Sequence, residues 1–177
     1  MSTIKVENLT GITSGANANK VIVPAGQTLD ASGATLVPPA GHMVQHVYQR
    51  RNADISTSSN SAYITAASIS FTPLYANSKL ELYMNYSAGR NQQDMRWRFY
   101  DNTASFQIER TGIHRHSGVN TDADPARHTF LAYYSPGNTD TRDLELQFFN
   151  ETGSGNAWGH TYGGQTGSYF VIREIKV

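Results

Sequence analysis

The chain has 177 residues, no formal net charge and 16% charged residues, against about a quarter in a typical soluble protein. Because there is no cationic surplus to contact phosphates, nucleic acid is excluded as an expected partner. The sequence contains no cysteine, which excludes a disulfide scaffold, a zinc site built on cysteine and a thiol nucleophile.

The N-terminal segment, residues 1–41, has short apolar pieces, such as VIV at 21–23, that are interrupted every few residues by Gly, Pro or Asn. This spacing excludes a helix, and a segment of about 40 residues rarely buries enough surface to fold alone. Two interpretations stay open: a flexible linker, or a segment that winds with identical copies around a shared axis. The recurrence of Val, Ile and Leu favours winding, because a linker does not need them. The PPAG sequence at 38–41 predicts the boundary, and the second domain is expected over 42–177.

The first residues, MSTIKVENLTG, lack the basic head and continuous apolar run of a signal peptide. No stretch approaches the roughly 18 apolar residues of a membrane span. We therefore expect a soluble protein that is made in a cytoplasm and is not inserted into a membrane.

From residue 42 onward the sequence has the pattern of β-structure. Leu80, Leu82 and Met84 alternate with polar residues, which predicts a strand with one face on a core. Trp97 lies on the apolar face of another alternating run and is predicted in the core. Strands are predicted at 42–49, 62–71, 79–88, 95–100, 105–109, 128–134, 143–150 and 168–177.

The final run, SYFVIREIKV at 168–177, is apolar on both faces over its first half. This pattern predicts a strand that is covered by a second sheet on one side and by a further layer on the other. A second subunit is the simplest such layer. The other predicted strands are expected to form the sheets around this one.

Seven or eight short strands separated by turn signals predict an all-β fold. The expected architecture is an antiparallel β-sandwich of jelly-roll type, preceded by the extended or intertwined N-terminal segment. No helix longer than one turn is predicted. Jelly rolls and other sandwiches share this pattern, so the strand order stays open.

Several stretches resemble bacteriophage fibre and virion structural proteins of the marine or cyanophage type. STIKVENLTG at 2–11 and NKVIVPAGQTLDASGATLVPPAG at 19–41 look like the N-terminal segment of many marine-phage structural proteins. The body resembles the C-terminal domain that such proteins carry, in the pieces ISFTPLYANSKLEL, RWRFYDNTASFQIER, HTFLAYYSPG and YFVIREI. The resemblance implies a homotrimer with the C-terminal domain outermost and with no fixed catalytic residues.

The resulting functional hypothesis is a non-enzymatic tail fibre or spike in the virion, assembled in the host cytoplasm. Its N-terminal segment is expected to contact other virion proteins, and its β-sandwich to project outward and bind a host-surface glycan. Three weak sites held together gain avidity without tight individual contacts. The main alternative is a purely architectural capsid-decoration or tail component without receptor binding. Two further alternatives are a secreted carbohydrate-binding module and a small trimeric tailspike hydrolase.

The long polar loop at 111–127 contains a His-x-His pair, His114 and His116. On an extended backbone both imidazoles point the same way, and three such pairs on a trimer axis would suit an octahedral transition metal. An exposed polar loop is the competing interpretation. Arg115 and Asn120 in the same loop are candidates for contact with a receptor.

A second loop, predicted at 151–167, carries three ring-bearing side chains in the sequence NAWGHTYGG. Trp158, His160 and Tyr162 are candidates for contact with a glycan, because an exposed ring can stack on a sugar face. Packing in the core or against a neighbouring subunit is the alternative.

Enzymatic glycan cleavage needs two carboxyl groups at a set separation. Asp140, Asp143, Glu145 and Glu151 are predicted in loops or on solvated strand exteriors. The sequence has no G-x-S-x-G elbow and no phosphate-binding loop with its Lys-Ser/Thr. We therefore predict that the chain is not an enzyme and uses no cofactor.

Overall fold

The computed structural model describes residue 25 and residues 38–51, 55–57, 59, 61–90, 95–110, 126–150, 157–159 and 168–177. The chain divides into two units, Met1–Val37 and Pro38–Val177. The PPAG sequence opens the second unit, and Gly41 takes a φ of 85°, which suits glycine, as the chain turns into the first strand. The two interpretations of the N-terminal segment, winding with identical copies or a flexible linker, concern residues that lie outside the described part of the chain.

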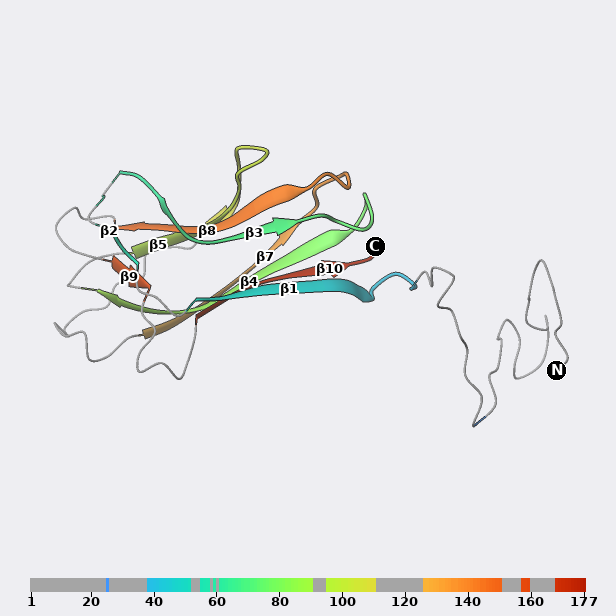
Figure 1. Ribbon diagram of the computed structural model, residues 1–177, viewed down its shortest axis with the longest axis horizontal. Coiled ribbons are helices and arrows are strands. Elements are labelled where there is room, and N and C mark those ends of the chain that lie inside the picture. The colour runs from blue at the N-terminus through green and yellow to red at the C-terminus, as the bar shows by residue number, and fades with distance from the viewer. Residues whose placement is uncertain are drawn as a thin grey trace, which may run out of the picture. The chain divides into compact units, whose positions relative to one another are not determined.

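The regular structure of the described residues consists of ten strands (Figure 1). They are β1 (Met43–Arg51), β2 (Ser56–Thr57), β3 (Ile64–Phe71), β4 (Lys79–Arg90), β5 (Met95–Asp101), β6 (Phe106–Arg110), β7 (Ala126–Tyr134), β8 (Arg142–Asn150), β9 (Ala157–Gly159) and β10 (Ser168–Ile175). All eight predicted strands are confirmed, with ends that differ by at most two residues. Among the described residues, no helix is long and apolar enough to cross a membrane.

Two short strands lie where loops were predicted. β2 and β9 have two and three residues, too few to produce a visible alternation in the sequence. They pair with each other, and β9 also pairs with the end of β4. β7 begins at Ala126, inside the loop predicted at 111–127.

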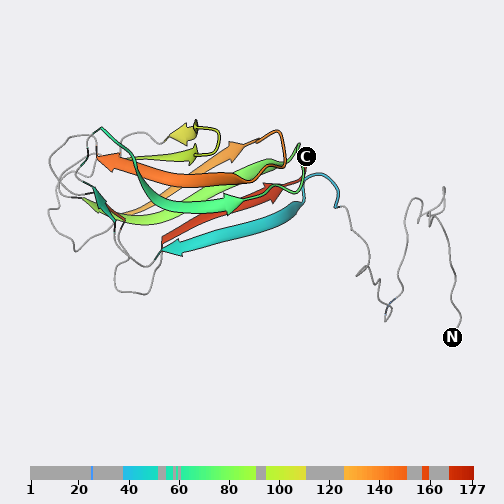
Figure 2. The ribbon, with the colours of Figure 1, turned by 45° about the horizontal axis from the view of Figure 1, so that its top comes forward.

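The eight longer strands pair as one long folded hairpin. β5 pairs with β6, β4 with β7, β3 with β8 and β1 with β10, all antiparallel. These nested pairs fall into two sheets: sheet A contains β1-β10-β4-β7, extended by β9 and β2, and sheet B contains β3-β8-β5-β6. The two sheets lie face to face (Figure 2). This order of strands confirms the predicted jelly roll.

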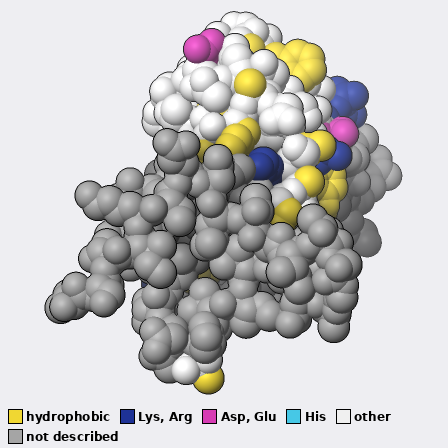
Figure 3. Space-filling model, turned by 90° about the vertical axis from the view of Figure 1, so that its right-hand side faces the viewer, with side chains coloured by type: hydrophobic (Ala, Val, Ile, Leu, Met, Phe, Trp, Pro, Cys, Tyr) yellow, Lys and Arg dark blue, Asp and Glu magenta, His cyan; other side chains and the backbone are white. Residues whose placement is uncertain are grey.

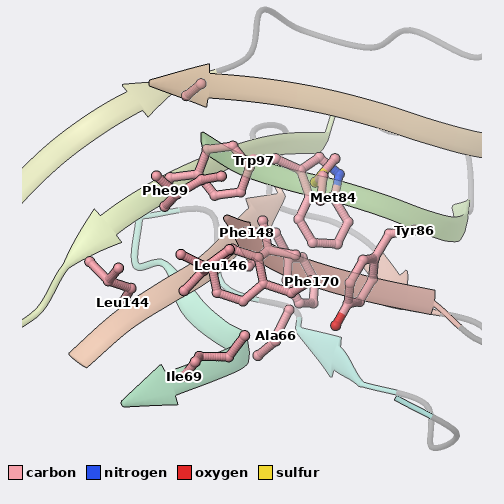
Figure 4. Packing of buried hydrophobic residues seen from close by; sticks show 14 of the residues in the cluster. Ala66, Ile69, Met84, Tyr86, Trp97, Phe99, Leu144, Leu146, Phe148 and Phe170 are labelled. Carbon is pink, nitrogen blue, oxygen red and sulfur yellow. The ribbon is translucent and has the colours of Figure 1, made fainter. Parts of the chain in front are cut away.

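The core between the sheets is rich in aromatic rings (Figure 4). Trp97 is fully buried, as predicted, and its ring centroid lies 4.9 Å from that of Phe148 and 5.3 Å from that of Tyr86. Phe99 of sheet B stacks on Phe170 of sheet A at 5.7 Å. These ring contacts hold the two sheets together and fix which face of each sheet points outward.

Candidate functional site

Most of the predicted site residues lie outside the described residues: His114, Arg115, His116, Asn120, His160 and Tyr162. Trp158 lies in β9, where its backbone pairs with Ser56 of β2 and with Gly89 of β4. Within the described part of the chain, no three metal-ligating side chains gather at one point. The metal and receptor sites in the two loops therefore stay predictions.

An apolar row crosses the outer face of sheet A, and we call it the sheet A stripe. It consists of Tyr48 on β1, Val171 on β10, Tyr83 on β4 and Leu131 on β7, each paired with the next across the strands. Tyr48 is 59% exposed and Leu131 is 45% exposed. Val171 is only 8% exposed, although it faces away from the core cluster between the sheets.

Charged side chains lie in the row beside the sheet A stripe, with Glu81 between two cations, Arg173 and Lys79. Arg173 Nη1 lies 2.7 Å from Glu81 Oε1. The hydroxyl of Tyr133, a side chain that is 55% exposed, donates to Glu81 Oε2 at 3.4 Å, and Lys79 Nζ lies 5.6 Å from the centre of the Tyr133 ring. The outer face of sheet A therefore carries an apolar row beside a row in which Arg173 and Glu81 form an ion pair.

Sequence reasoning did not assign the sheet A stripe to a site. One part of the sequence did point to this surface. The run at 168–177 is apolar on both faces over its first half, and this pattern predicted a covering layer outside the sheet. The other three members come from strands far apart in the sequence. Their alignment depends on the register of β1, β10, β4 and β7, which no single stretch shows.

The outer face of sheet B carries a network of hydrogen-bonded polar side chains beside the rings of Tyr63 and Phe149. Thr65 Oγ1 donates to Glu145 Oε2 at 3.0 Å, and the Gln147 amide also donates to that oxygen. Arg98 Nε donates to Gln147 Oε1 at 2.7 Å, and the Arg98 guanidinium lies 3.8 Å from the centre of the Tyr63 ring. Glu145 is on the strand exterior, as predicted, but it is only 9% exposed because these side chains cover it.

A buried ion pair joins three strands near the end of the body that carries the C-terminus. Arg142 Nη1 lies 2.9 Å from Asp101 Oδ2, and the Tyr134 hydroxyl donates to the same oxygen at 2.7 Å. The backbone N–H of Ala104 donates to Asp101 Oδ1 at 2.9 Å. Burial, followed by the hydrogen bond to Asp101, raises the pKa of Tyr134 to about 12. This network holds the β5–β6 turn against β7 and β8.

Glu174 is a second buried carboxylate with a structural role. Its side chain points inward from β10, and the backbone N–H groups of Leu74 and Tyr75 donate to it at 2.9 and 3.0 Å. The carboxylate therefore fixes the β3–β4 turn to the last strand. Its contacts are those of an anchor for a loop, as are the contacts of Asp101.

The space-filling view in Figure 3 shows the end of the body near the C-terminus. Hydrophobic, cationic and acidic side chains lie close together along one margin of the described surface. This mixed margin differs from the apolar row across the outer face of sheet A. We therefore take that outer face as the candidate interaction surface.

No protein-family model matches the chain, and no curated protein matches it either. Among solved structures, it is similar to infectious bursal virus derived T=1 particles, with a TM-score of 0.43 and 11% identity over 88% of this chain and 40% of that chain. For the infectious bursal disease virus VP2 subviral particle the TM-score is 0.41 and the identity 12%, over 94% of this chain and 46% of that chain. The chain thus spans less than half the length of the solved chains it matches.

Proposed function

We propose that the chain is a non-enzymatic structural component of a bacteriophage virion. In this proposal it is a homotrimeric fibre or spike whose N-terminal segment attaches to the particle. Its jelly-roll body projects outward and binds a glycan on the host surface. The proposal draws on the sequence resemblance at 2–11 and 19–41 and on the way the body is built.

The observation that carries this proposal is that the two ends of the body differ: the chain enters at one end, and the long connections leave from the other. The chain enters beside β10, where Gly41 N donates to the Lys176 carbonyl at 2.7 Å and Lys176 Nζ donates to the Pro38 carbonyl at 2.8 Å. The long connections that contain the predicted contact residues leave from the other end of the strands. Their flanking strand ends are Arg110, Ala126, Asn150 and Ser168, and Ala126 pairs with Ala88 near the end of β4 (Figure 1).

This separation of the entry end from the loop end suits a domain at the tip of a fibre. A trimer that is anchored at the end where the chain enters would present three copies of the opposite end to a cell surface. Each copy needs only weak affinity, because the second and third contacts become intramolecular once the first has formed. The buried carboxylates Asp101 and Glu174 hold turns in place, which fits a scaffold better than a catalyst.

Particle association is the direct test of the virion role. Antibodies raised against the chain should label gradient-purified particles of the phage that encodes it, as seen by immunoelectron microscopy. A chain that is abundant in infected cells but absent from purified particles would contradict the proposal. Release of reducing sugar from host polysaccharide by the purified chain would contradict the non-enzymatic part.

Glycan attachment is tested on an array of host glycans with the full chain. We expect Trp158→Ala to weaken binding roughly tenfold, which corresponds to the loss of one aromatic contact of about 1.4 kcal/mol. Phe106→Ala is the matched control, because Phe106 carries an exposed ring and pairs with Asp101 at the opposite end of the body from β9. A chain that is present in the particle but binds no glycan would favour the purely architectural role.

A further inference from the structure

We infer that the outer face of sheet A binds a glycan that carries carboxylate groups, with the sugar chain lying along the sheet A stripe. The inference rests on the glycan attachment of the proposed function. It adds a contact surface separate from Trp158 and gives the glycan a chemical class. Three observations carry it: exposed rings, cations on both sides of them, and a carboxylate that is largely covered.

Aromatic rings lie together where β1 meets β10. The Tyr48 ring centroid lies 6.0 Å from that of His46 and 6.3 Å from that of Tyr169, and Tyr48 is 59% exposed. The face of such a ring packs on the apolar C–H face of a sugar, while a phenol hydroxyl can bond to a sugar hydroxyl. Neighbouring rings on one sheet face therefore offer contacts to successive sugars of a chain.

Cations flank these rings on both sides of the sheet A stripe. Arg50 pairs with Tyr169 in the row on one side, and Arg173 pairs with His46 in the row on the other. Lys79 follows one row beyond Arg173. Arg50 and Lys79 are exposed, and the Arg173 side chain is 44% exposed. A polymer that lies along the stripe would therefore meet cationic groups on either side.

The carboxylates of the face do not cancel these cations. Among the described residues that face outward from β1, β10, β4 and β7, Glu81 is the one carboxylate, and its side chain is only 15% exposed. Exposed cations beside a largely covered carboxylate leave a positive potential at the surface, which attracts an anionic ligand. Nucleic acids and anionic membranes need larger cationic clusters. Carboxylates spaced along a sugar chain therefore fit this face better.

The outer face of sheet B also carries aromatic rings, but an arginine of that face covers two of them. The Arg98 guanidinium lies 3.8 Å from the centre of the Tyr63 ring and 4.3 Å from that of the Tyr100 ring. The rings and the cation of sheet B are therefore engaged with each other. On sheet A, by contrast, Tyr48 and Arg50 are both exposed.

The test is a calorimetric titration of the full chain with polygalacturonate, a polymer whose sugars each carry a carboxylate. The matched ligand is the same polymer with its carboxylates reduced to alcohols, which should bind at least about tenfold more weakly. Arg50→Gln should weaken binding of polygalacturonate roughly threefold, and the double variant with Lys79→Gln roughly tenfold, because each exposed ion pair contributes little. Arg110→Gln is the matched control, since it removes the same charge from an exposed position on sheet B. Circular dichroism shows whether each variant is folded.

Equal binding of the two polymers, or an equal loss in Arg50→Gln and Arg110→Gln, would overturn the inference. Binding that Trp158→Ala removes and Arg50→Gln leaves unchanged would also overturn it, because the contact would then lie at β9. Equally tight binding of a single-stranded DNA oligonucleotide, with the same loss in Arg50→Gln, would show a general polyanion surface instead of a glycan site.

The failure of this inference is distinguishable from the failure of the proposed attachment. A chain that binds glycans on the array but not polygalacturonate would overturn the inference and leave the attachment in place. A chain that binds neither would contradict both.

Discussion

Glu174 shows how one buried side chain secures a distant turn. Its carboxylate lies within the sandwich and accepts hydrogen bonds from Leu74 and Tyr75, about one hundred residues earlier in the chain. A buried N–H that loses its acceptor costs about 1–3 kcal/mol, and bonds to a charged group are the stronger ones.

We expect Glu174→Gln to lower the free energy of unfolding by about 2 kcal/mol, because one acceptor oxygen and the charge are both lost. The measurement is urea unfolding followed by circular dichroism. Glu109→Gln, an identical change at an exposed position on β6, should leave the midpoint unchanged. Equal midpoints for the two variants would show that Glu174 does not anchor the turn.

Tyr86 predicts how stability responds to alkaline pH. Burial, partly offset by Arg51, raises the pKa of Tyr86 from 10.0 to about 12. The folded state therefore keeps the phenol proton over a range in which the unfolded chain releases it. The resulting stability is fully present below pH 10 and is lost as the pH rises to about 12.

We expect the thermal midpoint of the wild-type chain to fall between pH 10 and about pH 12, and to fall less in Tyr86→Phe. At neutral pH this variant should be as stable as the wild type or more stable, because the buried Tyr86 hydroxyl has no hydrogen-bond partner among the described residues. The check is the thermal midpoint as a function of pH. A clear loss of stability in Tyr86→Phe at neutral pH would contradict the prediction.

At the scale of elements, the Arg142–Asp101 pair ties β5, β7 and β8 together at one end of the sandwich. Arg142→Met leaves the Asp101 carboxylate buried without its cation, which costs about 3–5 kcal/mol. Adding Asp101→Asn should recover part of that loss, because the uncompensated charge is then gone. Denaturant unfolding of the two single variants and the double variant measures this coupling. Purely additive losses would show that the pair is not coupled.

The strands themselves could be predicted from the sequence, because alternation is a local signal. Leu80, Leu82 and Met84 were expected on one face of a strand, and all three are fully buried. The alternation places Glu174 on the same strand face as Phe170 and Ile172, but its acceptor role could not be seen, since its donors belong to a turn that is distant in the sequence. The short strands β2 and β9 were missed because they form only through pairing with each other and with β4.

The candidate surface was predictable only in part. The two-sided apolar run of β10 indicated a covering layer, yet the alignment of Tyr48, Tyr83 and Leu131 with Val171 depends on the nested pairing of distant strands. The predicted contact residues of the two long loops, apart from Trp158, lie outside the described residues and stay predictions.

At the scale of the molecule, the two ends of the chain differ in what they contribute. β10 lies between β1 and β4 in sheet A, and its Phe170 and Ile172 are fully buried. Removing residues 168–177 should therefore abolish the cooperative thermal transition. Removing residues 1–37, which belong to the other unit, should preserve it. Circular dichroism melts of both truncated chains provide the comparison, and loss of the transition in the second would contradict the prediction.

The nested pairing also determines when the body can fold during its synthesis. β1 leaves the ribosome first among the body strands, whereas its partner β10 is the last to be made. The nascent chain can pair β5 with β6, then β4 with β7 and β3 with β8, while β1 waits. Until β10 emerges, the edges of β1 and β4 that it will join stay open to other nascent chains on the same message. A translation product that stalls before residue 168 would therefore expose two strand edges, on β1 and β4, to which an extended strand of another chain could pair.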